Sequence, residues 1–182
     1  PRDAILAQMC TSIFGLIGFS GQIGREAELL AFTASLLPHY GDDWWMLSQH
    51  AFSLCEVGET DRADAIIERA YTMRPDNSHS AHVRSHVWYE AGETETGIAF
   101  LRTWLDENGK DGLVRSHLAW HAALWSLGEG EIDAMWEVFE AEVAPGSDCG
   151  LPINVVTDSA SLLYRAEMAG IAVDPKHRSA ER

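Results

Sequence analysis

The feature that most constrains this chain is a glycine that recurs at a fixed interval. Gly24, Gly58 and Gly92 are 34 residues apart, and Gly128 and Gly130 follow 36 and 38 residues after Gly92. Each glycine lies between two segments with helical hydrophobic spacing, and an acidic residue or Thr follows it closely. Glycine ends helices readily in the left-handed conformation, and Thr or Asp caps the helix that follows. The recurrence therefore predicts an array of helix-turn-helix repeats.

The hydrophobic spacing groups the chain into pairs of helices. The predicted pairs cover about 4–19 with 24–37, 43–57 with 60–73, 78–91 with 94–107, and 112–127 with 131–143, and a last helix covers about 152–169. Pro38 and Pro145 are expected to end the first and the last of these pairs, because proline cannot donate the helical backbone hydrogen bond. Since no stretch alternates polar and apolar residues for long, nine helices and no strand are expected.

The second pair matches the tetratricopeptide repeat (TPR) pattern at five positions. Counted from Trp44, these are positions 15, 20, 24, 27 and 32, occupied by Gly58, Ala63, Ile67, Ala70 and Pro75. Small residues at positions 20 and 27 let neighbouring helices approach closely, whereas Gly97 and Trp104 take these places in the third pair. The predicted fold class is therefore all-α, a right-handed α-solenoid of TPR-like helix-turn-helix repeats with a terminal helix.

This architecture predicts a single TPR-like repeat domain over residues 1–182. Its units cover about 4–38, 43–76, 78–109 and 112–145, followed by the terminal helix at 152–169 and a polar tail at 174–182. Stacked repeats of this kind form a superhelix, and we expect its concave face to be lined mainly by the first helix of each pair.

The charge balance limits the classes of partner. The chain has 13 Lys and Arg against 28 Asp and Glu, a formal charge of −15, which argues against nucleic acid and anionic membrane surfaces and favours a basic peptide, a cation or a metal ion. No apolar run approaches the roughly 18–20 residues of a membrane span, and no secretory signal is recognised.

The three cysteines, Cys10, Cys55 and Cys149, are an odd and sparse set typical of free thiols, so a reducing, cytoplasmic location is expected.

Four of the eight histidines form two His-x-x-x-His pairs, His82 with His86 and His117 with His121. Residues four apart share one face of a helix, and both pairs lie on first helices of consecutive repeats, on the stripe expected to face the concave groove. The last helix is expected to pack beside the fourth pair, which brings Asp158 within reach of an imidazole. We therefore expect the four histidines and Asp158 to converge on one polar spot.

Three interpretations of these histidines stay open. They bind a divalent metal such as zinc, with Asp158 as a further ligand or an orienting carboxylate. They form a structural hydrogen-bond network with Asp158, Tyr89, Tyr164 or backbone carbonyls. Alternatively, they line an aromatic ligand pocket together with Trp120, Trp125 and Trp88. Arg165, seven residues after Asp158, is a candidate for binding a carboxylate or for an ion pair with a neighbouring helix. The metalloprotease pattern His-Glu-x-x-His is absent from both pairs, so no general base is placed by motif.

Several segments of the third and fourth pairs resemble the tetratricopeptide repeat protein 38 family. They are residues 82–87 with Gly92 and 97–101, residues 116–125, and residues 155–165 with 168–170, and the resemblance extends from about Phe14 to Val173. That family has no firmly established biochemical activity, so the resemblance implies a fold rather than a function. Tyr89 stands where the family usually has Glu, and Leu118 and Ala119 stand where it often has Asn and an aromatic residue. Any polar site shared with the family would therefore be reduced here.

These observations favour a binding protein that holds a peptide, a protein or a small molecule in its concave groove. The alternatives are a metal-binding protein or His-based enzyme that uses a four-His groove, and a structural assembly module. A non-enzymatic role is favoured because no catalytic motif is present, and no cofactor beyond a divalent metal is implied. The candidate groove residues are His82, His86, His117, Trp120, His121, Asp158, Tyr89 and Arg165, and the candidate metal ligands are the four paired histidines.

Overall fold

The structure, a computed structural model, describes residues 2–11, 15–109, 112–147 and 150–177. Within these ranges it is helical and contains no strand, which confirms the all-α prediction. The chain divides into two compact units, residues 1–93 and 94–182. The division falls just after Gly92, between the two helices of the predicted third repeat, and the proposed single domain over 1–182 stays a prediction. Cys149 and residues 178–182 of the predicted polar tail lie outside the described residues.

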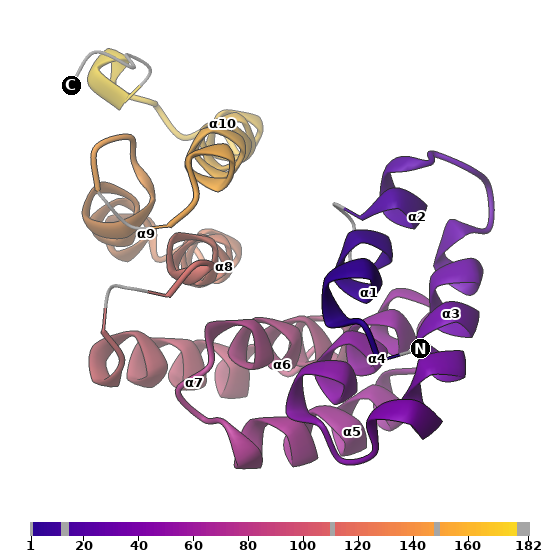
Figure 1. Cartoon of the computed structure of the whole chain (residues 1–182). Helices are drawn as coiled ribbons and strands as arrows, with labels where there is room; N and C mark the ends of the chain where they lie inside the picture. The colour runs from indigo at the N-terminus through magenta and orange to yellow at the C-terminus, as the bar shows by residue number, and fades with distance from the viewer. Residues whose placement is uncertain (1, 12–14, 110–111, 148–149, 178–182) are drawn as a thin grey trace. The chain divides into compact units, whose positions relative to one another are not determined.

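The first unit is built around one central helix (Figure 1). Its helices are α1 (Ala4–Cys10), α2 (Leu16–Phe19), α3 (Arg25–Tyr40), α4 (Trp44–Glu56), α5 (Thr60–Met73) and α6 (Ser78–Ala91). Helix α4 packs against α3, α5 and α6, and every residue from Met46 to Cys55 is buried. Burial raises the pKa of the Cys55 thiol to about 12, so this cysteine is a structural thiol rather than a nucleophile.

Local capping explains where these helices begin and end. The Asp43 carboxylate accepts hydrogen bonds from the backbone N–H groups of Trp45 and Met46, and the Asn77 side chain caps α6 in the same way. The recurrent glycines adopt left-handed conformations, with φ 81° at Gly58 and 74° at Gly92, where a side chain would be strained. The helix-turn-helix joints predicted from the 34-residue recurrence are thus confirmed.

Three details of the helix prediction are wrong. The expected helix 4–19 is two helices, because Thr11 is extended and ends α1; residues 12–14 lie outside the described residues. Pro38 lies inside α3 and does not end it; the helix stops at Gly41. A single proline near the end of a helix removes only one backbone hydrogen bond, so the helix continues past it. The described residues therefore contain ten α-helices rather than nine.

The TPR positions of the second repeat form the centre of this unit. Ala63, Ile67 and Ala70 have no exposed surface and pack with Phe52 of α4 and Val83 of α6. The small side chains let the three helices approach closely, as the sequence pattern predicts.

Ala63→Leu is expected to lower the free energy of unfolding by about 1–3 kcal/mol, because three added carbons have no space in this packed interface. Ala65→Leu, on the exposed face of the same helix, is the matched control and should change stability by less than about 0.5 kcal/mol. Urea denaturation of both variants measures the difference, and equal midpoints would contradict the close-packing explanation.

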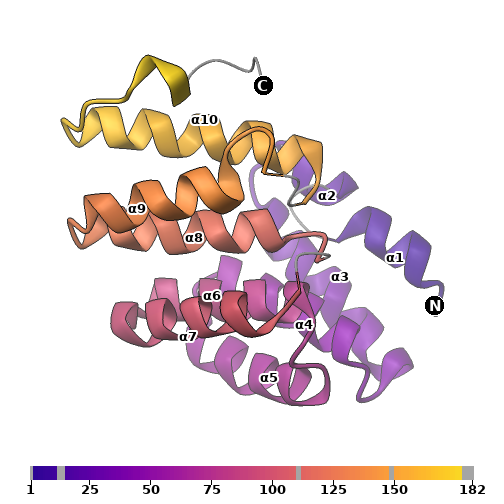
Figure 2. The same cartoon turned by 90° about the vertical axis from the view of Figure 1, so that its left-hand side faces the viewer.

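The second unit is organised around α8. Its elements are α7 (Thr94–Glu107), α8 (Arg115–Gly128), α9 (Ile132–Val138), a π-helical segment η1 (Phe139–Val143), α10 (Pro152–Met168) and a short 3₁₀ turn η2 (Pro175–His177). Helix α8 contacts α7, α9 and α10, and Figure 2 shows α8, α9 and α10 running side by side. Met135, Phe139, Val143 and Leu162 are fully buried in its core. No helix of the described residues is long and apolar enough to span a membrane.

A buried arginine ties three elements of this unit together. The guanidinium of Arg115 makes two hydrogen bonds to the Glu142 carboxylate, at 3.0 and 3.1 Å, and also donates to the carbonyls of Leu105 and Asn108 at 2.9 and 2.7 Å. It thereby satisfies carbonyls at the C-terminal end of α7 that have no helical partner. The Arg115 side chain is only 5% exposed, so this ion pair is shielded from solvent.

Gly97 of α7 lies directly against the Trp125 side chain of α8. A Cβ atom at Gly97 would lie 2.3 Å from Cη2 of the Trp125 indole, which is itself buried. The indole therefore occupies the space that a side chain at position 97 would need. This contact explains why the third repeat has glycine at its position 20.

Candidate functional site

The first half of the predicted site is a pair of imidazoles on α6. The Nε2 atoms of His82 and His86 lie 2.8 Å apart and the ring centroids 4.4 Å apart. The Phe52 ring on α4 packs edge-on against His86 at 5.3 Å and lies 6.1 Å from His82. At this distance one nitrogen donates and the other accepts, so the hydrogen bond requires that the two rings are not both protonated.

A third histidine extends this pair toward α4. The ring of His79 lies 6.4 Å from that of His82, and its Nε2 is 3.2 Å from the Gln49 amide nitrogen. Because the amide nitrogen only donates, Nε2 of His79 accepts and the ring is neutral in this arrangement. Burial lowers the pKa of His79 to about 4.

As the pH falls from 7 to 5, the free energy of unfolding is expected to fall by roughly 1–2 kcal/mol through His79 alone. The unfolded chain takes up this proton near the ordinary pKa of 6.5, whereas folded His79 stays neutral down to about 4, so protonation favours unfolding throughout that interval. The pKa of His50, lowered by burial and by Arg62, acts in the same direction. Urea denaturation at both pH values measures the slope. His79→Gln should flatten it, and an unchanged slope would remove His79 as its source.

The second half of the predicted site is centred on a carboxylate–imidazole contact in the second unit. Nδ1 of His117, on α8, lies 2.8 Å from Oδ2 of the buried Asp158 on α10, and the Thr157 hydroxyl donates to the other carboxylate oxygen at 3.4 Å. An ionised carboxylate only accepts, so Nδ1 of His117 carries the proton. In the neutral ring, Nε2 then presents its lone pair away from Asp158, as in many metal ligands and general bases.

Aromatic contacts complete this half of the site. His117 stacks on Trp120 with centroids 5.0 Å apart, and His121 lies edge-on to His117 at 4.8 Å and to Trp120 at 4.9 Å. The indole Nε1 of Trp120 is buried and has no acceptor among the described residues. Four of the predicted residues, His117, Trp120, His121 and Asp158, are therefore brought together within one unit.

The other predicted residues have different positions. Tyr89 is 56% exposed near the end of α6, and Arg165 is exposed on α10, where it donates to the Ser161 hydroxyl at 2.6 Å. Trp125 belongs to the core beside Gly97. The α6 and α8 histidine pairs belong to different units, so their convergence stays a prediction from their spacing.

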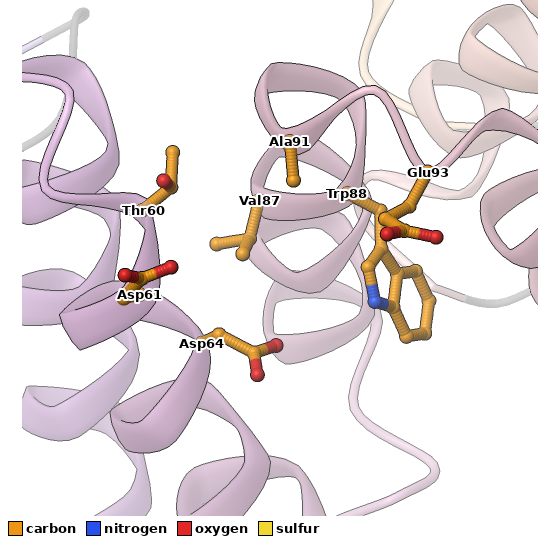
Figure 3. A pocket seen from close by; sticks show the side chains of 7 residues that line it. All are labelled: Thr60, Asp61, Asp64, Val87, Trp88, Ala91 and Glu93. Carbon is orange, nitrogen blue, oxygen red and sulfur yellow. The ribbon is translucent and has the colours of Figure 1, made fainter.

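A pocket of about 400 Å³ between α5 and α6 was not expected from the sequence (Figure 3). Its lining residues are Thr60, Asp61, Asp64, Val87, Trp88, Ala91 and Glu93. Figure 3 shows the two aspartates on α5 facing the apolar side chains of Val87 and Ala91 on α6. Three carboxylates and an indole would suit a positively charged group. The only sequence signal was the run of acidic residues after Gly58, which is also the usual composition of a helix start.

Comparison with known proteins places the fold in a class. No model of a known protein family matches the chain. The solved structure of the MamA RS-1 ArsTM double mutant is similar, with a TM-score of 0.55 and 14% sequence identity, over 97% of this chain and 85% of that one. At this identity the likeness shows the fold alone. The chain is therefore a TPR-like helical-repeat protein of the α-solenoid class.

Proposed function

We propose that this chain is a protein-interaction module that holds a peptide, or a small ligand, in a groove lined by the first helices of its repeats. The fold class supports an interaction module, since TPR-like repeats present extended surfaces of this kind. The observation that carries the proposal is the group of His117, Trp120 and His121 on α8. These rings are held in place by mutual stacking and by Asp158, and the side chains of His117 and Trp120 keep part of their surface exposed, where a ligand can contact them.

The chemistry of the partner follows from charge. The formal charge of −15 favours a basic peptide over an acidic one, and the acidic pocket between α5 and α6 supports the same preference. We also propose membership of the tetratricopeptide repeat protein 38 family, supported by the motifs of the third and fourth repeats. The sparse cysteines, of which Cys10 and Cys55 are free thiols among the described residues, support a cytoplasmic location.

A peptide selection tests this function. A displayed library of random 12-residue peptides is panned on the full chain, and the affinities of the selected peptides are measured by fluorescence anisotropy. We expect basic peptides to be enriched, and Trp120→Ala and His117→Ala to weaken their binding at least about tenfold. His39→Ala, an exposed histidine on α3, is the control. The proposal fails if no peptide binds below 100 µM or if the control variant loses as much affinity as the groove variants.

A second candidate function is the binding of a divalent metal such as zinc by the four paired histidines. The contact between His117 and Asp158 favours it, because a carboxylate that holds the proton on Nδ1 leaves the lone pair of the neutral ring on Nε2, the atom that would bind the ion. The same arrangement would serve a His-based enzyme. Asp158→Asn separates these functions from a purely structural assembly role: metal affinity or catalysis should fall about 10–100-fold, whereas assembly should be unaffected.

A further inference from the structure

We propose that His82 and His86 chelate one late divalent transition-metal ion, for which Zn²⁺ is the probe, through their two Nε2 atoms. The proposal does not depend on peptide binding, and it specifies which atoms act in the metal-binding candidate. The two nitrogens already point at each other across 2.8 Å on one face of α6. No rearrangement of the backbone is needed to place both on one ion.

The spacing of the two nitrogens fits a shared ion. With Zn–N bonds of about 2.0–2.1 Å and a tetrahedral angle, two imidazole nitrogens on zinc lie about 3.3 Å apart. The pair therefore has to open by about half an ångström to admit the ion. A small rotation of two half-buried side chains supplies that movement, and the ion replaces the hydrogen bond that the rings make without it.

The rings are held ready for this role by their surroundings. Both lie one turn apart on α6, whose Val83 and Val87 are buried in the core of the first unit, so the helix cannot turn away. Phe52 packs against both imidazoles and limits their rotamers. Much of the entropy that ordering two flexible ligands would cost is therefore already lost on folding.

The donor set selects the kind of ion. Imidazole nitrogen prefers zinc, copper and nickel, whereas calcium and magnesium require several oxygen ligands. In the neutral pair one Nε2 carries a proton; on binding that proton moves to Nδ1 of the same ring, and both Nε2 lone pairs go to the metal. Water completes the coordination.

Calorimetric titration of the full chain, purified without a histidine tag, with ZnCl₂ tests the proposal. We expect one ion bound per chain, and His82→Gln and His86→Gln should each weaken binding at least about tenfold, since loss of even an outer-shell partner has such an effect. His39→Gln should bind as the parent does, and His86→Cys should retain binding because thiolate also ligates zinc. Circular dichroism of each variant without metal establishes that it is folded.

Thermal melting gives a second readout. Zn²⁺ should raise the Tm of the parent and of His39→Gln, but not of His82→Gln, and Mg²⁺ should raise none of them. A parent chain whose melting does not respond to 1 mM Zn²⁺, or equal zinc affinity in the parent and both glutamine variants, would overturn the proposal. Neither result would bear on peptide binding. A loss in His117→Gln that equals the loss in His82→Gln would support one ion shared by both pairs, and no loss there would support the α6 pair as the complete protein ligand set.

Discussion

Arg115→Ala is expected to lower the free energy of unfolding by about 3–5 kcal/mol. The substitution removes both hydrogen bonds that Arg115 donates to the Glu142 carboxylate, in a site where that side chain is only 16% exposed. It also leaves the carbonyls of Leu105 and Asn108 without the donors that the guanidinium supplies. A buried polar group that loses a hydrogen-bond partner lowers the free energy of unfolding by the cost of its desolvation. Three groups lose hydrogen bonds here, so the expected effect is large. Urea denaturation followed by circular dichroism measures the effect.

Arg102→Ala is the matched control. This arginine, also in the second unit, forms an ion pair with Glu131 at 2.6 Å, but both side chains are about half exposed. Solvent screens such a pair, and its loss should cost between 0 and about 1 kcal/mol. Similar losses in the two variants would mean that burial does not set the strength of the Arg115 contact.

Trp125→Ala is the second large effect, with an expected cost of about 3–5 kcal/mol, because a buried indole is removed from the interface of α7 and α8. The cavity lies directly beside Gly97, where no side chain exists to fill it. Thermal denaturation of the variant should therefore show a much lower Tm than that of the parent.

A double-mutant cycle separates this contact from general core loss. In the parent, Gly97→Ala should destabilise the fold by about 1–3 kcal/mol, although alanine is the better helix former, because its Cβ collides with the indole. In the Trp125→Ala background the collision is gone, and Gly97→Ala should be neutral or stabilising by up to about 1 kcal/mol. Equal effects of Gly97→Ala in both backgrounds would contradict the proposed contact.

The sequence predicted those features of the repeat that depend on residues close together in the chain. The glycine recurrence placed the turns, and the spacing of Ala63, Ile67 and Ala70 identified the buried face of α5. The prediction that Pro38 ends its helix was wrong, because the effect of a proline depends on its distance from the helix end, which the local sequence does not give. The sequence alone does not explain the glycine at position 97, since its reason is a side chain 28 residues away on the next helix.

In the candidate site, too, contacts within one helix could be predicted better than contacts between helices. The proximity of His82 to His86 follows from a helical interval of four residues, and the structure places their nitrogens in contact. The expected packing of the last helix beside the fourth pair predicted Asp158 within reach of an imidazole, but no interval rule identifies His117 as its partner, because 41 residues and a change of helix separate them. Arg115 carried no sequence signal, since its importance comes from burial and from carbonyls at the end of another helix.

The number of residues in the π-helical segment at the end of the fourth repeat determines whether Glu142 can reach Arg115. The N–H of Ala144 bonds to the carbonyl of Phe139, five residues earlier, so this turn holds one residue more than an α-helix would. Phe139 and Val143 are both buried, while Glu142 from the same turn reaches Arg115. Deleting the exposed Ala141 would restore α-helical geometry and rotate Glu142 by about 100° away from Arg115. Homologues that keep the buried ion pair should therefore conserve the number of residues in this turn more strictly than their identity.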